Sequence, residues 1–167
     1  DPATDANGAG LASFQFQVVD DGGTADGGEN TDQSANTMTI DVTSVNDAPA
    51  GTDNTVTTLE DTDYTFVLAD FGFSDPNDDP ANDFQSVIIT NAPTGLLLNG
   101  VQVTDGQEVT AADIGSGLLT YDPATDANGA GLASFQFQVV DDGGTADGGE
   151  NTDQSANTMT IDVTSVN

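Results

Sequence analysis

The stretch DPATDANGAGLASFQFQVVDDGGTADGGENTDQSANTMTIDVTSVN occupies residues 1–46 and recurs, without one change, at residues 122–167. The two copies are offset by 121 residues. An internal copy at a fixed period is the sequence signature of a tandem array. We therefore expect two parts: residues 1–46 as the C-terminal strands of a preceding repeat, and residues 47–167 as one complete 121-residue repeat.

Two segments of the duplicated stretch alternate apolar with polar side chains. Residues 11–19 carry Phe14 and Phe16 at every second position, and residues 36–45 carry Met38 in the same pattern. A period of two predicts half-buried β-strands, and a Gly- and Asp-rich loop joins them. Because two strands alone are marginally stable in water, we expect residues 1–46 to need the rest of a domain.

The remainder of the repeat adds more short strands and almost no helical pattern. Asn99-Gly100 between two apolar segments is a strong signal for a two-residue hairpin turn. Residues 110–117 support at most one helical turn, because Gly115 and Gly117 end it. The strands expected outside the duplicated stretch are residues 54–59, 64–68, 84–90, 96–98, 101–103 and 118–121.

Many short strands separated by turn residues predict an all-β fold, an antiparallel β-sandwich of two sheets with Greek-key connections. The paired Cys and central Trp of antibody domains are absent, since the chain has no Cys and no Trp. The expected likeness to those domains is therefore one of architecture.

Acidity is the extreme feature of the composition. The chain has 29 acidic residues, 25 of them Asp, and no Lys, Arg or His, which gives a formal net charge of −29. No side chain can form a salt bridge, and two carboxylates ~4 Å apart repel by about 4 kcal/mol at a protein-like dielectric. A compact fold therefore needs cations from solution. Nucleic acid is excluded as a partner because nothing here neutralises phosphate.

The same composition argues against catalysis and against membrane insertion. Without His, Cys, Lys or Arg, the common nucleophile–base and zinc-hydrolase arrangements cannot be built. A pair of carboxylates for glycoside hydrolysis remains available, but no Trp and only two Tyr are present to bind a sugar. No apolar run approaches the ~20 residues that span a bilayer. We expect a protein that is not an enzyme.

The acids gather in loops that a Greek-key sandwich places at its two ends. Successive loops alternate between the ends, so the junction near residue 47, the loop after residue 68 and the loop after residue 140 share one end, the entry pole. The turn after residue 59, the loop after residue 121 and the exit junction share the other end, the exit pole. The predicted calcium ligands are Asn46, Asp47, Asp75, Asn77, Asp79, Asp141 and Asp142 at the entry pole and Glu60 and Asp61 at the exit pole, with Asp122 and Asp126 as weaker candidates. Asp78 is expected in the same acidic cluster at the entry pole but is not among the predicted ligands.

One loop carries a spacing suited to a hard cation. Asp75-x-Asn77-x-Asp79 can turn oxygens at positions one, three and five toward one centre, and Ca²⁺ takes six to eight oxygens, including Asn and backbone carbonyls. The loop is not an EF-hand, because Pro80 stands where that motif needs Gly. The alternative is that Asp and Asn are present only because they favour turns. Residues 143–150 faintly resemble a calcium β-roll repeat but occur once per unit, which favours a flexible loop.

Several motifs together resemble the cadherin-like, Ig-like tandem repeats of giant bacterial surface and biofilm proteins. They are Val45-Asn46-Asp47-Ala48-Pro49, Glu60-Asp61-Thr62, Phe73-Ser74-Asp75-Pro76 and Phe135-Gln136-Phe137-Gln138-Val139-Val140-Asp141-Asp142. The resemblance implies a Ca²⁺-binding sandwich in long extracellular arrays, often secreted through type I systems. It also implies that Asp47, Glu60, Asp75, Asn77 and Asp79 are metal ligands.

These observations favour a structural extender whose junctions are stiffened by Ca²⁺, on the bacterial cell surface or in an extracellular fibre. Its expected partners are neighbouring identical repeats placed end to end and, in a fibre, other copies of the chain. Two alternatives stay open: a ligand-binding adhesin module, and a filament subunit in which residues 1–46 complement the strands of another chain.

Overall fold

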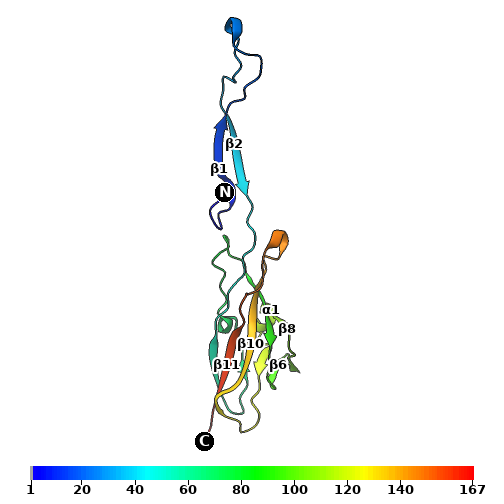
Figure 1. Ribbon diagram of the computed structural model, residues 1–167. Helices are drawn as coiled ribbons and strands as arrows, with labels where there is room; N and C mark the ends of the chain where they lie inside the picture. The colour runs from blue at the N-terminus through cyan, green and yellow to red at the C-terminus, as the bar shows by residue number, and fades with distance from the viewer. Residues whose placement is uncertain (1) are drawn as a thin grey trace. The chain divides into compact units, whose positions relative to one another are not determined.

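The structure, a computed structural model, describes residues 2–167. The chain divides into two compact units, Asp1–Ser44 and Val45–Asn167, labelled by element in Figure 1. The division falls two residues before the one expected from the repeat. Asn46 thus belongs to the second unit, where its side chain contacts the loop that follows β10.

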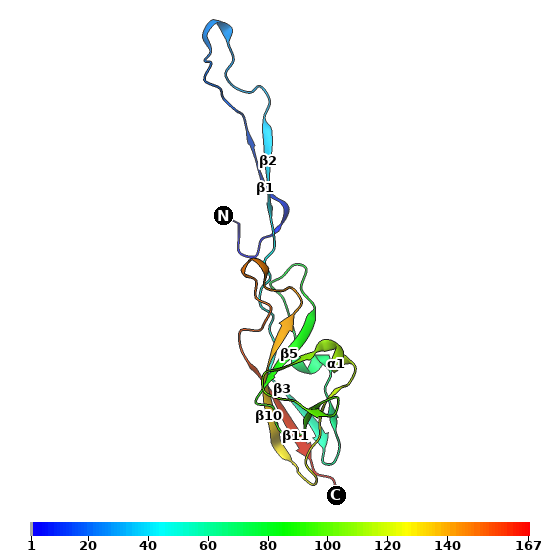
Figure 2. The same cartoon turned by 90° about the vertical axis from the view of Figure 1, so that its right-hand side faces the viewer.

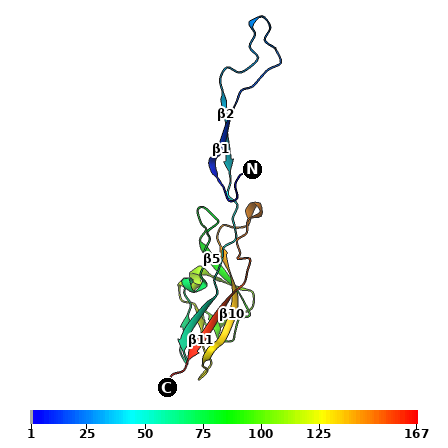
Figure 3. The same cartoon turned by 60° about the vertical axis from the view of Figure 1, so that its left-hand side comes forward.

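The first unit is a β-hairpin, drawn in blue to cyan in Figures 1 and 3. Strand β1 (Gly8–Phe16) pairs antiparallel with β2 (Asn36–Val42), and Phe14 lies opposite Met38. The loop between the strands contains one 3-10 turn, η1 (Ala25–Gly27). A bulge lies between Gly8 and Ala12. Strand β1 begins and ends three residues before the strand that the alternation of residues 11–19 predicts.

The second unit contains the remaining strands and three short helical segments. The helical segments are the 3-10 turns η2 (Leu68–Phe71) and η3 (Ala146–Gly148) and the single α-helical turn α1 (Ala111–Gly115). The strands are β3 (Asn54–Leu59), β4 (Tyr64–Thr65), β5 (Phe84–Thr90), β6 (Leu96–Leu98), β7 (Val101–Gln102), β8 (Gln107–Thr110), β9 (Leu119–Tyr121), β10 (Gly129–Asp141) and β11 (Asn157–Thr164).

These strands form two sheets, which confirms the predicted sandwich. One sheet has the order β3-β11-β10-β5-β8 and the other has the order β4-β9-β6-β7. Figure 2 shows β3, β5, β10 and β11 of the larger sheet running alongside one another. The chain crosses between the sheets after β3, β4, β5, β7, β8 and β9, so strands distant in sequence become neighbours.

The larger sheet is not wholly antiparallel, contrary to the prediction. Strand β3 pairs in parallel with β11, Val56 opposite Ile161. The cause lies in the alternation of loops between the two poles. The entry junction and the loop after β10 lie at the same pole, so the strands that leave them, β3 and β11, run in the same direction.

The core between the sheets is built on four phenylalanines. Phe66 meets Phe135 edge to face with ring centres 5.6 Å apart, and Phe71 meets Phe137 in the same way at 5.1 Å. All four side chains are buried. Phe135 and Phe137 lie two residues apart on β10, so the alternation read from the sequence correctly placed them on the inner face.

In the second unit the tight turn and the single helical turn were predicted correctly, whereas the length of β4 and the presence of β8 were not. Asn99 and Gly100 both have positive φ, which confirms the tight hairpin turn, and α1 is the expected single turn. Strand β4 stops at Thr65, because the Asp70 carboxylate accepts a hydrogen bond from the Val67 amide and starts a 3-10 turn. Strand β8 was not predicted, since Val109 is its one apolar residue and its position at the sheet edge needs no more.

Candidate metal site at the entry pole

The entry pole collects three loops of the second unit, as the sequence predicts. The Asn46 side-chain amide donates to Asp141 Oδ1 at 3.0 Å, which joins the entry junction to the end of β10. The Asp47 backbone amide donates to Asp78 Oδ2 at 2.9 Å, which joins the junction to the loop between η2 and β5. The Asp83 amide donates to Asp142 Oδ1 at 2.8 Å and closes the ring of loops.

Asn46 is the residue on which this ring depends. Its side-chain nitrogen also donates to the carbonyls of Gly144 at 3.1 Å and Glu150 at 2.8 Å, and its Oδ1 accepts from the Asn82 side chain. Its backbone carbonyl accepts from the Glu150 amide at 2.9 Å. A Cβ on Gly143 would collide with the Asn46 side chain, so glycine is required there by this close approach.

Two carboxylates lie inside the ring and are buried. Asp141 is 0% exposed and Asp75 is 6% exposed. Asp141 Oδ1 accepts from the Gly143 amide at 2.9 Å, and Asp75 Oδ2 accepts from the Asn82 amide at 2.6 Å. The other oxygen of each carboxylate, Asp141 Oδ2 and Asp75 Oδ1, is buried without a hydrogen-bond partner among the described residues. Buried polar atoms of native proteins are rarely left in this state.

The burial of Asp141 and the charges around it disfavour its ionised form. Burial raises the pKa of the Asp141 carboxyl, and the nearby charges of Asp75 and Asp78 raise it further, against the lowering effect of the Gly143 and Asn46 hydrogen bonds. The folded unit therefore holds this proton more tightly than the unfolded chain does. Without a bound cation, Asp141 therefore stabilises the fold only while its carboxyl is protonated. This contribution is fully present below the ordinary pKa of Asp and is lost as the pH rises through the raised pKa.

Not every predicted ligand at this pole points inward. Asp75 and Asp141 are buried and Asp47 is half-buried, whereas Asn77, Asp79 and Asp142 are exposed. In this loop Asp75 and Asp78 are more buried than Asn77 and Asp79. The side chain of Asp78 turns inward because it accepts a hydrogen bond from the Asp47 amide. The predicted ligand set omitted Asp78. It also omitted Asn82, which no spacing in the sequence singles out.

The exit pole uses its acids differently. Glu60 accepts from the Val166 amide at 2.7 Å and from the Asn128 side chain at 2.9 Å, and Asp61 accepts from the Asp126 amide at 3.2 Å. These contacts confirm that the turn after β3, the loop after β9 and the exit junction meet at one end. The Glu60 and Asp61 carboxylates cap backbone amides near the surface, and neither is buried.

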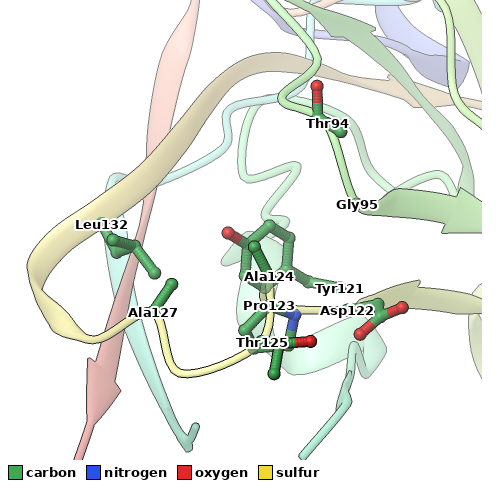
Figure 4. A pocket seen from close by; sticks show the side chains of 9 residues that line it. All are labelled: Thr94, Gly95, Tyr121, Asp122, Pro123, Ala124, Thr125, Ala127 and Leu132. Atoms are coloured by element: carbon green, nitrogen blue, oxygen red, sulfur yellow. The ribbon is translucent and has the colours of Figure 1, made fainter. Parts of the chain in front are cut away.

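Near the exit pole the surface is hollowed by about 400 Å³ between the turn before β6 and the loop after β9. Figure 4 shows the side chains that line it, among them Tyr121, Asp122, Pro123 and Leu132. Burial and the charge of Asp122 raise the pKa of the Tyr121 hydroxyl. Asp122 is the one carboxylate of the lining, so the hollow lacks the oxygen ligands of a cation site.

No ready-made group of three or more carboxylates is arranged to hold a metal ion among residues 2–167. The entry pole instead offers two buried carboxylates, the Asp78 carboxylate nearby, amide side chains and backbone carbonyls. Ca²⁺ accepts such mixed oxygen sets, whereas transition metals prefer His and Cys ligands. The donor chemistry thus fits a hard divalent cation.

The comparison with known families agrees with the fold. The model of the family described as Bacterial Ig domain matches residues 46–164. The chain therefore belongs to the bacterial Ig domain family, whose members typically occur in surface proteins as structural or adhesion modules. No curated protein and no solved structure gives a significant match. No helix in the described part of the chain is long and apolar enough to cross a membrane.

Proposed function

We propose that the second unit is a calcium-binding extender repeat of a long extracellular adhesin or fibre, in which Ca²⁺ bound at the entry pole stiffens the junction with the neighbouring repeat. The observation that carries the proposal is the pair of buried carboxylates, Asp75 and Asp141, each with one oxygen that lacks a hydrogen-bond partner.

The first argument is energetic. A buried carboxylate without a counter-charge costs several kcal/mol unless it is protonated, paired or bound to metal. The chain has no basic residue to pair with it. A divalent cation would supply the missing charge and would bind carboxylate oxygens that have no hydrogen-bond partner.

The second argument concerns position. Asn46 and Asp47 belong to the junction where the chain enters the unit, and they contact Asp141 and Asp78 directly. A cation among these groups would tie the entering chain to the body of the sandwich. In an array, the exit pole of the preceding repeat would add Glu60 and Asp61 of that repeat to the same junction.

The third argument is the perfect duplication. Identical copies in tandem suit a protein whose role is to span distance, because each copy repeats the same length and the same junction. A recognition module gains nothing from an identical neighbour except a higher local concentration.

The test is the melting temperature of the chain in excess calcium and in excess chelator. A site at ~100 times its Kd stabilises the folded unit by about 2.7 kcal/mol, which raises the melting temperature of a domain of this size by roughly 10 °C. We expect Asp141→Asn to abolish most of this rise.

Asp20→Asn is the matched control, because Asp20 has the same sequence neighbours as Asp141 but is exposed. We expect it to retain the full calcium response. An equal melting temperature in calcium and chelator, or an equal loss of response in both variants, would contradict the proposal.

A further inference from the structure

The first and the last strand of the second unit lie side by side and run in the same direction. Strand β3 pairs in parallel with β11 over six positions, Asn54–Leu59 against Met159–Thr164. Val56 and Ile161 lie opposite each other in this pairing, and both side chains are buried. Core side chains therefore close the inner face of the ladder that joins the two strands.

Hydrogen bonds extend this ladder at both poles. At the entry pole the Thr158 amide donates to Asp53 Oδ1 at 2.7 Å. At the exit pole the Glu60 amide donates to the Thr164 carbonyl at 2.9 Å, and the Glu60 carboxylate accepts from the Val166 amide at 2.7 Å. The two strands are thus fastened to each other from the residue before β3 to the exit junction.

The chain enters β3 from one pole and leaves β11 at the other. The entry junction holds Asn46 beside Asp141, and the exit junction holds Val166 beside Glu60. Tension along an array therefore pulls β3 toward the entry pole and β11 toward the exit pole. Because the bonds of a parallel pair are evenly spaced, they share this load and must break together. Two strands pulled apart from one end would instead lose their bonds one after another.

We propose that the paired strands β3 and β11 are the mechanical clamp of the unit, a ladder loaded in shear that keeps the sandwich folded under tension. This inference rests on the extender role proposed above, because an extender is the part of an array that carries load. The clamp lies in the hydrogen bonds between β3 and β11, not in the cation site. Forced unfolding is governed by the rate of unfolding, so the force that the clamp withstands depends on the direction of pulling.

The load passes directly from β3 to β11, because these strands are neighbours in the sheet order β3-β11-β10-β5-β8. Strands β10, β5 and β8 lie on the far side of β11 and are not between the two points of attachment. The second sheet is not between them either. A change in β8, at the opposite edge of the same sheet, is therefore a natural control for a change in β3.

The test is single-molecule force spectroscopy through cysteine handles, which are unique because the chain has no Cys. One variant carries Ser44→Cys and Asn167→Cys, so that the second unit is pulled from opposite poles. The other carries Ser44→Cys and Ala156→Cys. Ala156 directly precedes β11, so this pair pulls β3 and β11 from the same pole. All three positions are exposed, and each variant is measured in excess calcium and in excess chelator.

We expect a several-fold higher unfolding force between opposite poles than at the same pole, both in calcium and in chelator. Equal forces in the two directions would overturn the proposal. A difference that is present only in calcium would also overturn it, because the cation site would then carry the load. A difference that calcium does not change would support the clamp even if the melting experiment contradicted the calcium site.

Val56→Ala and Val109→Ala, each added to the opposite-pole variant, locate the clamp within the sheet. The two valines are 5% and 0% exposed and lie in β3 and β8, the two edge strands. Each substitution removes buried apolar groups and should lower the melting temperature, but only Val56 lies in the loaded ladder. We expect Val56→Ala to lower the unfolding force and Val109→Ala to leave it unchanged. An equal drop in both variants would overturn the assignment of the clamp to β3 and β11.

Discussion

The same 46 residues fold twice in this chain, once as an isolated hairpin and once inside a sandwich. Both copies form the same antiparallel register and the same 3-10 turn in the connecting loop. They differ in extent and burial. Strand β10 continues to Asp141, where it pairs with β5, whereas β1 ends at Phe16.

The difference separates what local sequence determines from what the surrounding chain determines. Asp20 and Asp141 both accept a hydrogen bond from the amide two residues later, at 2.8 Å and 2.9 Å. Only Asp141 is buried and receives the Asn46 side chain. The candidate metal site therefore forms only where the entry junction and the loop after η2 reach the end of β10, and the hairpin sequence alone does not form it.

The largest effect in this comparison is expected from truncating one phenylalanine at equivalent positions. Phe135→Ala removes a side chain that packs edge to face on Phe66 and should reduce the free energy of unfolding of the second unit by about 3–5 kcal/mol. Phe14→Ala alters an exposed side chain and should change it by less than about 0.5 kcal/mol. Urea unfolding monitored by circular dichroism measures both values.

An equal loss of stability in Phe14→Ala and Phe135→Ala would contradict this prediction. If Phe14→Ala lowered the stability of the second unit as much as Phe135→Ala, then the two hairpins would exchange places in solution. The comparison between an open and a covered copy would then no longer describe the molecule.

A smaller effect is expected at the last residue of each copy. Asn46→Ala removes the side-chain amide that donates to the Asp141 carboxylate and to the carbonyls of Gly144 and Glu150. These three acceptors then lose that donor. We expect a loss of about 1–3 kcal/mol in the free energy of unfolding of the second unit. Asn167→Ala changes an exposed residue and should have no measurable effect in the same urea titration. Equal effects would show that the entry junction is not held at the pole.

Sequence reasoning recovered the sheets well, because alternation has a direct physical cause. Strands β3 and β5 have the predicted bounds, residues 54–59 and 84–90, since β3 is rich in the β-branched residues Thr and Val and β5 is buried on both faces. Strand β8 escaped notice because an edge strand needs only Val109 to face the core. Strand β4 was overestimated because Asp70 competes for the backbone amide of Val67.

The sequence predicted which loops meet at the candidate site, but it did not predict which side chains turn into it. Alternation of loops between the poles correctly placed Asn46 near Asp141 and Asp61 near Asp126. The spacing of Asp75, Asn77 and Asp79 did not indicate which side chains turn inward. That choice depends on the Asp47 and Asn82 amides, which reach Asp78 and Asp75 from other points along the chain.

The smallest effect is expected where the two copies agree. Asp41 accepts a hydrogen bond from the Gly10 amide and Asp162 accepts one from the Gly131 amide, both at 2.6 Å, and each bond closes the bulge at the start of its hairpin. Asp162→Ala should cost the second unit about 0.5–1.5 kcal/mol, the net contribution of one such bond. Because the bond is local, Asp41→Ala should accelerate amide hydrogen exchange at Gly10 by a factor similar to the one that Asp162→Ala produces at Gly131. A response at Gly131 alone would mean that the surrounding sandwich, and not the hairpin sequence, holds the bulge in place.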